Sequence, residues 1–282
     1  MKEIKHTTQK NNGRYYTPSD MVCFMLDTAG YYGQNILQKH IIDNSCGDGA
    51  FLCEIVRRYI EISLQNKYST EQIKYDLEYY IHGIEIEKNE YQKCINNLNK
   101  ITELSGIYNI QWDIKNADAL NVQNYNGKMD FVVGNPPYVR VHNLLDYSSV
   151  KQFHLTQQGM TDLYIVFYEI GIAMLNKTGV LCYINPSSLF NSLAAKLLRK
   201  SLIQNQLLKK VIDLKHTQIF NATTYTAIIL LSQEKNNCIE YKNYETQKIE
   251  TLKYSDFYID GNFYFSNANN LQKIKNILFM AA

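Results

Sequence analysis

Short apolar runs alternate with longer amphipathic segments along most of this chain. Short apolar runs are typical of buried strands, whereas apolar residues at helical spacing predict helices. Strands are therefore expected at residues 40–43, 80–86, 107–112, 129–134, 179–184, 208–214 and 224–231. Helices are expected between them, at residues 50–59, 89–101, 163–175 and 189–203. Strands separated by helices of this length predict an α/β fold, with a doubly wound, mostly parallel seven-stranded sheet covered by helices on both faces.

Two segments interrupt this alternation. The connection 139–161 is longer than a structural loop needs, and such loops are often lids or binding segments. From residue 235 onward the alternation is weak, and it ends in a short amphipathic helix near Leu271. The pattern predicts one domain over residues 1–234 and an extension or linker over residues 235–282.

Composition sets few limits on function. The 282 residues are 45% hydrophobic, enough for a substantial core, and the net charge of +2 neither requires nor excludes a nucleic-acid partner. The six cysteines show no C-x-x-C pair and no histidine at metal-ligand spacing, so they indicate reduced thiols and no metal site. The amino-terminal residues lack the apolar stretch of a signal peptide, and no apolar run is long enough to span a membrane. We therefore expect a soluble, cytoplasmic protein.

The segment Asn135-Pro136-Pro137-Tyr138 carries the clearest chemical signal. It follows the predicted strand 129–134, and ligands of open α/β sheets bind at the carboxyl ends of the strands. The Asn135 amide oxygen and the Pro136 carbonyl are two acceptors for one amino group, and the Tyr138 ring offers a face for a planar group. The arrangement suits a planar amine as substrate. The alternative is that the prolines simply end the strand.

A second candidate site lies between the first predicted strand and the first predicted helix. Gly47 and Gly49 let the backbone turn tightly next to a ligand, but the G-x-G-x-x-G pattern of dinucleotide sites is absent. Glu85, at the end of the second strand, is placed to accept from ribose hydroxyls, and Asp118, after the third strand, could accept from an adenine amine. Together they describe an adenosyl ligand without phosphates, and S-adenosylmethionine fits. Taken singly, the glycines could form a packing turn and Asp118 a helix cap.

Over residues 13–232 these motifs follow the order found in the gamma class of DNA adenine methyltransferases, the TaqI-like group, which the chain resembles. The likeness begins with the segment Gly-Arg-Tyr-Tyr-Thr-Pro at residues 13–18, ahead of the glycine loop. It implies the Rossmann-like fold of S-adenosylmethionine-dependent methyltransferases, with residues 1–234 as the catalytic domain. It implies cofactor binding near Thr17, Asp43, Ser45, Gly47, Glu85, Ile86, Asp118, Ala119 and Pro137. It implies catalytic roles for Asn135, Pro136, Tyr138 and Phe220.

The resemblance also implies a reaction. A methyl group would pass from S-adenosylmethionine to the N6 amine of an adenine flipped out of double-stranded DNA, with the base held between Tyr138 and Phe220. Such enzymes serve restriction-modification or related defence systems. The Asn-Pro-Pro-Tyr motif also occurs in methyltransferases that modify glutamine in release factors or guanine in ribosomal RNA. A binding module of the same fold without catalysis is a further alternative, and the segment 13–18 favours the DNA adenine class.

Contacts with DNA are harder to assign from sequence. Arg140, beside the catalytic motif, is a candidate phosphate contact. A basic cluster consists of Lys196, Arg199, Lys200, Lys209, Lys210 and Lys215. Such a cluster is more often a solvated helix face than a binding site. Single-chain members of the resembling group carry a carboxyl-terminal recognition domain, so recognition is expected from a domain missing here or from a separate specificity subunit.

Overall fold

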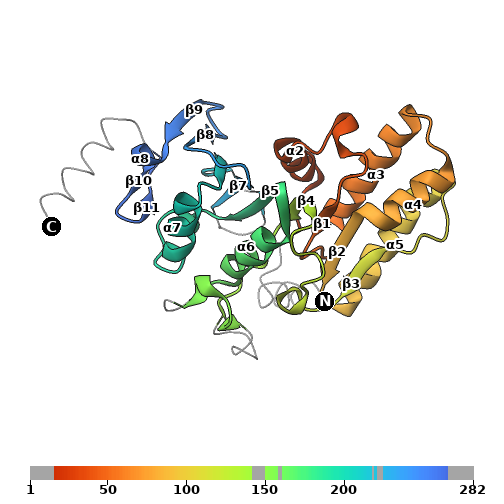
Figure 1. Cartoon of the computed structure of the whole chain (residues 1–282), viewed down its shortest axis with the longest axis horizontal. Helices are drawn as coiled ribbons and strands as arrows, with labels where there is room; N and C mark the ends of the chain where they lie inside the picture. Colours follow the sequence, from red (N-terminus) through yellow and green to blue (C-terminus); the bar gives the residue numbers. More distant parts are fainter. Residues whose placement is uncertain (1–15, 142–149, 158–160, 218, 221–224, 266–282) are drawn as a thin grey trace, which may run out of the picture.

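The computed structural model describes residues 16–141, 150–157, 161–217, 219–220 and 225–265 (Figure 1). In this described part, nine strands form one sheet in the order β3-β2-β1-β4-β5-β7-β6-β8-β9. The strands are β1 Ile41–Asp43, β2 Ile81–Glu85, β3 Asp113–Asn116, β4 Met129–Gly134, β5 Leu175–Pro186, β6 Leu208–Asp213, β7 Thr226–Ser232, β8 Cys238–Asn243 and β9 Ile249–Lys253. A separate hairpin pairs β10 Tyr258–Ile259 with β11 Asn262–Phe263.

Helices connect most of these strands. The α-helices are α2 Ser19–Ala29, α3 Ala50–Gln65, α4 Thr70–Tyr80, α5 Lys88–Glu103, α6 Leu163–Met174, α7 Lys196–Gln204 and α8 Tyr254–Phe257. Short 3-10 helices are η1 Gly33–Ile36, η2 Ala119–Asn121, η5 His154–Thr156 and η6 Ser187–Phe190.

Most of the sheet is parallel. Strand β1 lies between β2 and β4 and pairs with both in parallel, and β3 and β5 continue this parallel part on either side. Strand β7 is inserted antiparallel between β5 and β6. Because the chain leaves β1 toward β2 and later returns to β4, the topological switch point lies at the carboxyl end of β1. Ligands of open α/β sheets bind at such a point.

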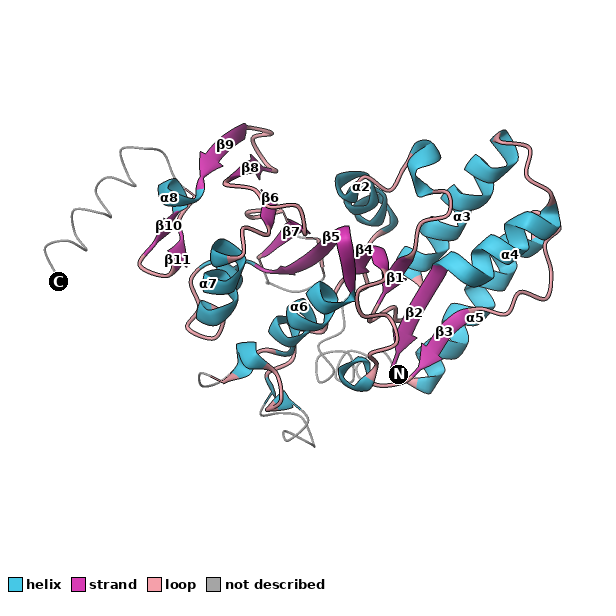
Figure 2. Ribbon diagram, in the orientation of Figure 1, coloured by secondary structure: helices cyan, strands magenta, loops and turns pink. Residues whose placement is uncertain are grey.

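Helices cover both faces of the sheet, which is the doubly wound arrangement predicted from the sequence. Adjacent side chains of one strand enter different cores: Val132 of β4 packs in the core with α6 and α7, and Val133 in the core with α2, α3 and α5. Figure 2 shows α2 on one side of β4 and β5, and α6 and α7 on the other. Strands buried on both faces must be apolar throughout, which explains their continuous apolar runs.

The sequence prediction was wrong for the third strand. Residues 107–112 do not form a strand, and β3 consists of the following four residues, Asp113–Asn116. Asn109 adopts a positive φ of 55°, which interrupts an extended conformation, and Trp112 donates its indole N–H to the Asn99 side chain of α5. Strand β3 pairs only with β2 and therefore lies at the sheet edge, where a polar strand with one buried residue, Ile114, is stable.

The prediction of a helix at residues 189–203 was also wrong about where this helix begins. Residues 187–190 form η6, and α7 begins only at Lys196. Two helices, α2 and α4, were not predicted. The strand count differs as well, because residues 238–243 and 249–253 of the expected extension add β8 and β9 to the sheet.

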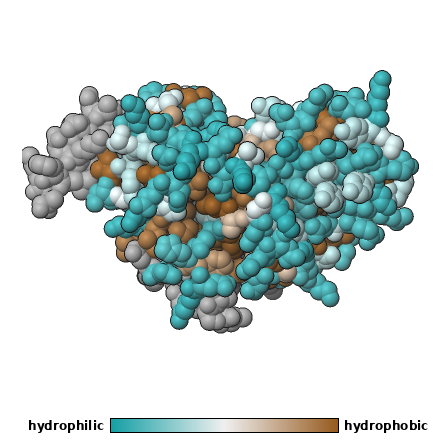
Figure 3. Space-filling view, in the orientation of Figure 1, coloured by the Kyte–Doolittle hydropathy of each residue, from teal (hydrophilic) through white to brown (hydrophobic). Residues whose placement is uncertain are grey.

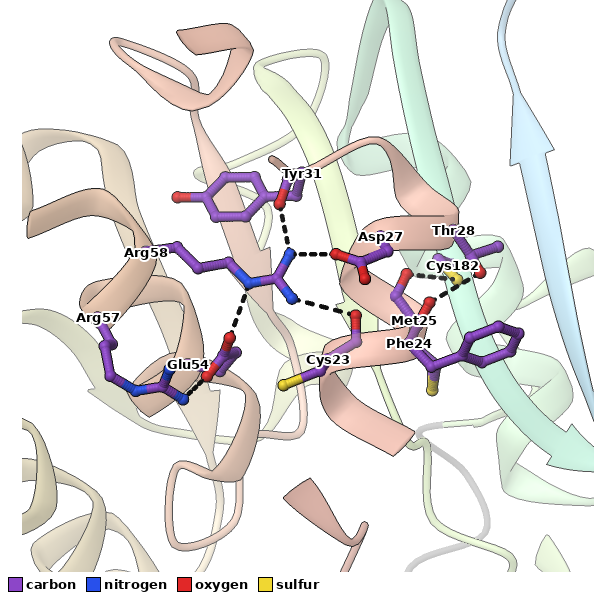
Figure 4. Close-up of polar contacts among 10 residues, drawn as sticks. All are labelled: Cys23, Phe24, Met25, Asp27, Thr28, Tyr31, Glu54, Arg57, Arg58 and Cys182. Atoms are coloured by element: carbon purple, nitrogen blue, oxygen red, sulfur yellow. Dashed lines mark hydrogen bonds and ion pairs between the residues drawn. The ribbon is translucent and has the colours of Figure 1, made fainter. Parts of the chain in front are cut away.

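Arg58 of α3 fixes the position of α2 (Figure 4). Its guanidinium binds two carboxylates and two carbonyl oxygens at 2.6–3.2 Å. These partners are the side chains of Asp27 and Glu54 and the main chains of Cys23 and Tyr31. From the sheet, the Cys182 thiol of β5 donates to the Met25 carbonyl at 3.6 Å. Because α2 starts two residues after Thr17, these contacts also hold Thr17 in place.

The surface in Figure 3 is mostly hydrophilic, and an apolar patch shows near the middle of that view. Among the described residues, no helix combines the length and the apolar character needed to cross a bilayer. All six cysteines are free thiols.

Candidate active site

The segment Asn135-Pro136-Pro137-Tyr138 follows β4 directly at the switch point. The register pairs Asp43 of β1 with Val133 of β4, so the chain after β4 lies beside the glycine loop that follows β1. Gly134 has a φ of 150°, and a side chain here would come within 2.7 Å of the Asp43 carboxylate. This close approach explains why glycine precedes Asn135. Pro136 is buried, whereas Asn135 is partly exposed.

Three sequence motifs meet at Asn135. Its side-chain Nδ2 donates to the Thr17 hydroxyl at 3.3 Å, and its carbonyl accepts from the Ser45 hydroxyl at 3.4 Å. Thr17 comes from the amino-terminal motif and Ser45 from the glycine loop. With Nδ2 bound to Thr17, the amide orientation is fixed, and Oδ1 is the atom of this side chain that can accept from an amine.

Glu85 holds the glycine loop in shape. It is only 5% exposed, and its two carboxylate oxygens accept from the Gly47 N–H at 2.9 Å and the Glu87 N–H at 2.8 Å. Gly47 has a φ of 55°, a conformation that favours glycine. A carboxylate oxygen can accept more than one hydrogen bond, so bracing the loop is compatible with the predicted role toward ribose hydroxyls. The predicted ribose acceptor therefore has a second role as a brace for the loop.

Asp43 is a buried carboxyl group in this site. It is 2% exposed, and one oxygen accepts from the Ser45 N–H at 3.0 Å. Burial is the main cause that raises its pKa to about 7, the Ser45 N–H lowers it, and the nearby Glu85 carboxylate raises it further. At neutral pH, Asp43 is therefore balanced between its neutral and ionised forms. A cation bound next to it would favour the ionised form.

The adenine side of the predicted cofactor site lies at the ends of β2 and β3. Ile86 follows β2 and is 59% exposed, a large apolar side chain open to a ligand. Asp118 Oδ1 accepts from the Leu120 N–H at 3.0 Å and so caps η2. This is the helix-cap role that the sequence offered as the alternative to ligand binding. Among the residues that the structure describes, the Asp118 side chain makes no other hydrogen bond, although its carbonyl accepts from the Asn121 N–H at 3.0 Å, and Oδ2 can therefore accept from a ligand. Ala119 is buried beneath it.

Tyr138 and Phe220 are in contact, but their rings are not parallel and leave no space for a base between them. Their ring centroids are 6.3 Å apart with an angle of 79° between the planes, an edge-to-face contact. Phe220 is 4% exposed and belongs to the core on the α2 side. The Tyr138 hydroxyl donates to the Ile184 carbonyl at 3.2 Å. A base could lie between the two rings only after Phe220 turned and moved, so the clamp stays a prediction.

The remaining candidates from the sequence are the basic residues and the predicted lid. Arg140 is exposed and pairs through its backbone with Asp162 as an isolated bridge. Arg199 is 1% exposed and bound to main-chain carbonyls, so its inclusion in a surface basic cluster was wrong. Lys210 and Lys215 form ion pairs with Glu240 and Asp213. Most of the predicted lid, residues 142–149 and 158–160, lies outside the described residues. No cluster suited to a metal ion occurs in the described part of the chain.

Residues 46–220 match the family model described as Eco57I restriction-modification methylase. The chain belongs to this family. The type II methyltransferase M.BstVI of Geobacillus stearothermophilus is 30% identical, over 88% of this chain and 46% of its own. The type II restriction enzyme and methyltransferase RM.Eco57I of Escherichia coli is 27% identical, over 72% of this chain and 25% of its own. The chain thus spans less than half the length of these relatives.

A solved structure with the same fold is the type I restriction-modification system methyltransferase subunit from Streptococcus thermophilus. It covers 94% of this chain, and this chain covers 53% of it, with a TM-score of 0.61 and 20% sequence identity. At this identity the likeness shows the fold alone. Together with the family match, it confirms the predicted family and the Rossmann-like methyltransferase fold.

The contact between Thr17 and Asn135 was not predicted from the sequence. Nor were the buried hydrogen bonds from Tyr168 to Asn185 and from Tyr183 to Asn44. The two tyrosines lie in apolar runs, where an aromatic residue ordinarily indicates core packing. No sequence signal distinguished their hydroxyl groups from those of other buried tyrosines.

Proposed function

We propose that this protein transfers a methyl group from S-adenosylmethionine to the N6 amine of adenine in DNA. The supporting observation is the fixed Asn135 amide beside the Pro136 carbonyl, at the switch point next to the Glu85 and Asp43 carboxylates. Two candidate acceptors for an amine therefore lie near a candidate acceptor for ribose hydroxyls. The restriction-modification methylase family supports DNA as the substrate.

The residues present fit the proposed cofactor. Glu85 would accept from the ribose hydroxyls, and Asp118 Oδ2 from the adenine amine. The exposed Ile86 side chain offers an apolar surface for the adenine ring. A positively charged methionine ammonium near Asp43 would favour its ionised form. S-adenosylmethionine supplies an electrophilic methyl group bonded to its sulfonium.

On the substrate side, the chain's own groups would activate the amine. The adenine N6 lone pair is delocalised into the ring, which makes it a weak nucleophile. Asn135 Oδ1 and the Pro136 carbonyl would accept hydrogen bonds from the two N–H groups of the amine and so favour a tetrahedral nitrogen, while Tyr138 stacks on the base. N6 would gain the methyl group as the bond from the methyl carbon to sulfur breaks, and N6 would then release one proton to water. Because the N6 amine is not accessible inside a duplex, the adenine must leave the helix.

Target recognition would need a further element. The chain spans less than half of its relatives M.BstVI and RM.Eco57I. We propose that a recognition domain or a separate specificity subunit selects the DNA site, within a restriction-modification or related defence system in the cytoplasm. Arg140 is our candidate for a phosphate contact near the flipped base.

Transfer of a labelled methyl group tests this proposal. The complete protein, with its recognition subunit where one exists, is incubated with labelled S-adenosylmethionine and double-stranded DNA, ribosomal RNA or release factor. Label in DNA, recovered as N6-methyladenine after digestion, is the expected result. Label recovered as methylglutamine or as methylguanine in RNA would move the protein to one of those classes. Cofactor binding without transfer to any substrate would indicate a binding module.

Variants of Tyr138 and Phe220 test whether each ring holds the extruded adenine. Stacking on an aromatic is worth about 1–3 kcal/mol per base, so Tyr138→Ala should weaken capture of the extruded adenine by that amount. A 2-aminopurine at the target position brightens when unstacked in solvent and dims on a ring, and this fluorescence measures the capture. Phe220→Leu keeps the apolar volume of a core residue but removes the ring. Unchanged fluorescence and methylation in Phe220→Leu would assign Phe220 to the core alone.

A further inference from the structure

Two buried tyrosines lie beneath the candidate site, between α6 and β5. Tyr168 of α6 and Tyr183 of β5 are both 0% exposed, with ring centroids 5.4 Å apart at an angle of 71°. Burying a hydroxyl is unfavourable unless it forms a hydrogen bond. The hydrogen-bond partners of these two hydroxyls therefore indicate which segment of the chain each tyrosine fixes in position.

Tyr168 holds the end of β5. Its hydroxyl donates to the Asn185 side-chain oxygen at 2.6 Å, and Asn185 is itself 0% exposed. The Asn185 amide in turn donates to the Pro186 carbonyl at 2.9 Å. The preceding residue, Ile184, provides the carbonyl that accepts from the Tyr138 hydroxyl. The strand end fixed by Tyr168 is therefore the one on which Tyr138 rests.

Tyr183 holds the opposite half of the site. Its hydroxyl donates to the Asn44 side-chain oxygen at 2.9 Å, and Asn44 is 1% exposed. Asn44 stands between Asp43 and Ser45 in the glycine loop. Two neighbouring tyrosines thus reach in different directions, one to the loop expected to hold the cofactor and one to the strand end beside Tyr138.

We propose that Tyr168 is a positioning residue for the substrate half of the active site. Acting through Asn185, it fixes the end of β5 and with it the plane of the Tyr138 ring. The inference rests on the proposed function, because it requires that Tyr138 stacks on the substrate base. It assigns to a core tyrosine a role that its burial alone does not reveal.

The variant Tyr168→Phe removes one hydroxyl and keeps the ring. A small misplacement of a group that orients the substrate is costly, so we expect kcat to fall about 10-fold. The 2-aminopurine at the target position should also be quenched less than in the wild type. The dissociation constant for S-adenosylmethionine, measured by calorimetry, should stay unchanged because the glycine loop is held by Tyr183.

Two other tyrosine variants serve as matched controls for Tyr168→Phe. Tyr183→Phe removes an equally buried hydroxyl from the neighbouring ring and should weaken cofactor binding instead. Tyr59→Phe removes a hydroxyl that donates to Asp76 at 2.9 Å between α3 and α4, away from the site. It should lower the melting temperature without changing kcat or the fluorescence.

A double variant separates positioning from stability. Tyr168→Phe leaves the buried Asn185 oxygen without its donor, whereas replacing both partners by apolar groups of similar shape is close to neutral for stability. Tyr168→Phe with Asn185→Leu should therefore regain part of the melting temperature, since only the Pro186 carbonyl then lacks its donor, and should keep the low kcat. The proposal is overturned if Tyr168→Phe loses only melting temperature, or if the double variant regains normal kcat. If the wild type methylates no adenine in DNA, the proposed function itself fails, and this inference fails with it.

Discussion

Replacing Asn135 with alanine should reduce the rate of methyl transfer by about 100-fold or more, the usual loss when a preorganised group that stabilises a transition state is removed. Asn135 Oδ1 is the proposed acceptor for one amine hydrogen, and its orientation is fixed by the bond from Nδ2 to Thr17. Binding of S-adenosylmethionine should be largely retained, because the proposed acceptors for its ribose and adenine are Glu85 and Asp118. Single-turnover transfer of labelled methyl to DNA measures the rate, and calorimetry measures cofactor binding.

Thr17→Val is the matched control for Asn135→Ala. It keeps the shape of residue 17 but removes the hydroxyl that accepts from Asn135 at 3.3 Å. The amide is then present but less well oriented, so the rate should fall by less than in Asn135→Ala. Near-normal turnover in Asn135→Ala would rule out the proposed mechanism, since the mechanism relies on Asn135 Oδ1 as one of its two acceptors.

The parts of the fold that were predicted from sequence are those buried on both faces. Strand β4 contains the apolar run 131–133 shortly before Asn135, and such a run between turn residues favours a central strand. Asp43, Glu85 and Asn135 could be placed together because they stand at the carboxyl ends of parallel strands, which share one edge of the sheet. The meeting of these residues therefore followed from topology alone.

Other elements depend on contacts that sequence pattern does not contain. Residues 107–112 are apolar enough for a strand, but the positive φ at Asn109 and the bond from Trp112 to Asn99 hold them in a loop. A signal for α4 was present and not used: Ser69 stands three residues before Gln72, a capping pattern, and the Ser69 hydroxyl accepts from the Gln72 N–H. The contacts of Tyr168 and Arg199 join segments far apart in the chain.

Replacing Glu85 with alanine should have the largest effect on cofactor binding. Hydrogen bonds to a charged group are worth about 1.5–3 kcal/mol each, and the variant loses the proposed ribose acceptor as well as the brace on Gly47. We expect the affinity for S-adenosylmethionine, measured by calorimetry, to fall about 100-fold, which corresponds to about 3 kcal/mol.

Glu85→Gln tests which function of the carboxylate matters. Both Glu85 oxygens accept from backbone N–H groups, those of Gly47 and Glu87, so a glutamine must direct its NH₂ group toward one of these donors. The loop should therefore be disturbed almost as much as in Glu85→Ala, although the shape is kept. Asp118→Ala should be milder, since one Asp118 oxygen only caps η2. If Glu85→Ala and Asp118→Ala both bound S-adenosylmethionine with wild-type affinity, the cofactor would have to bind elsewhere, and the proposed arrangement of the site would be wrong.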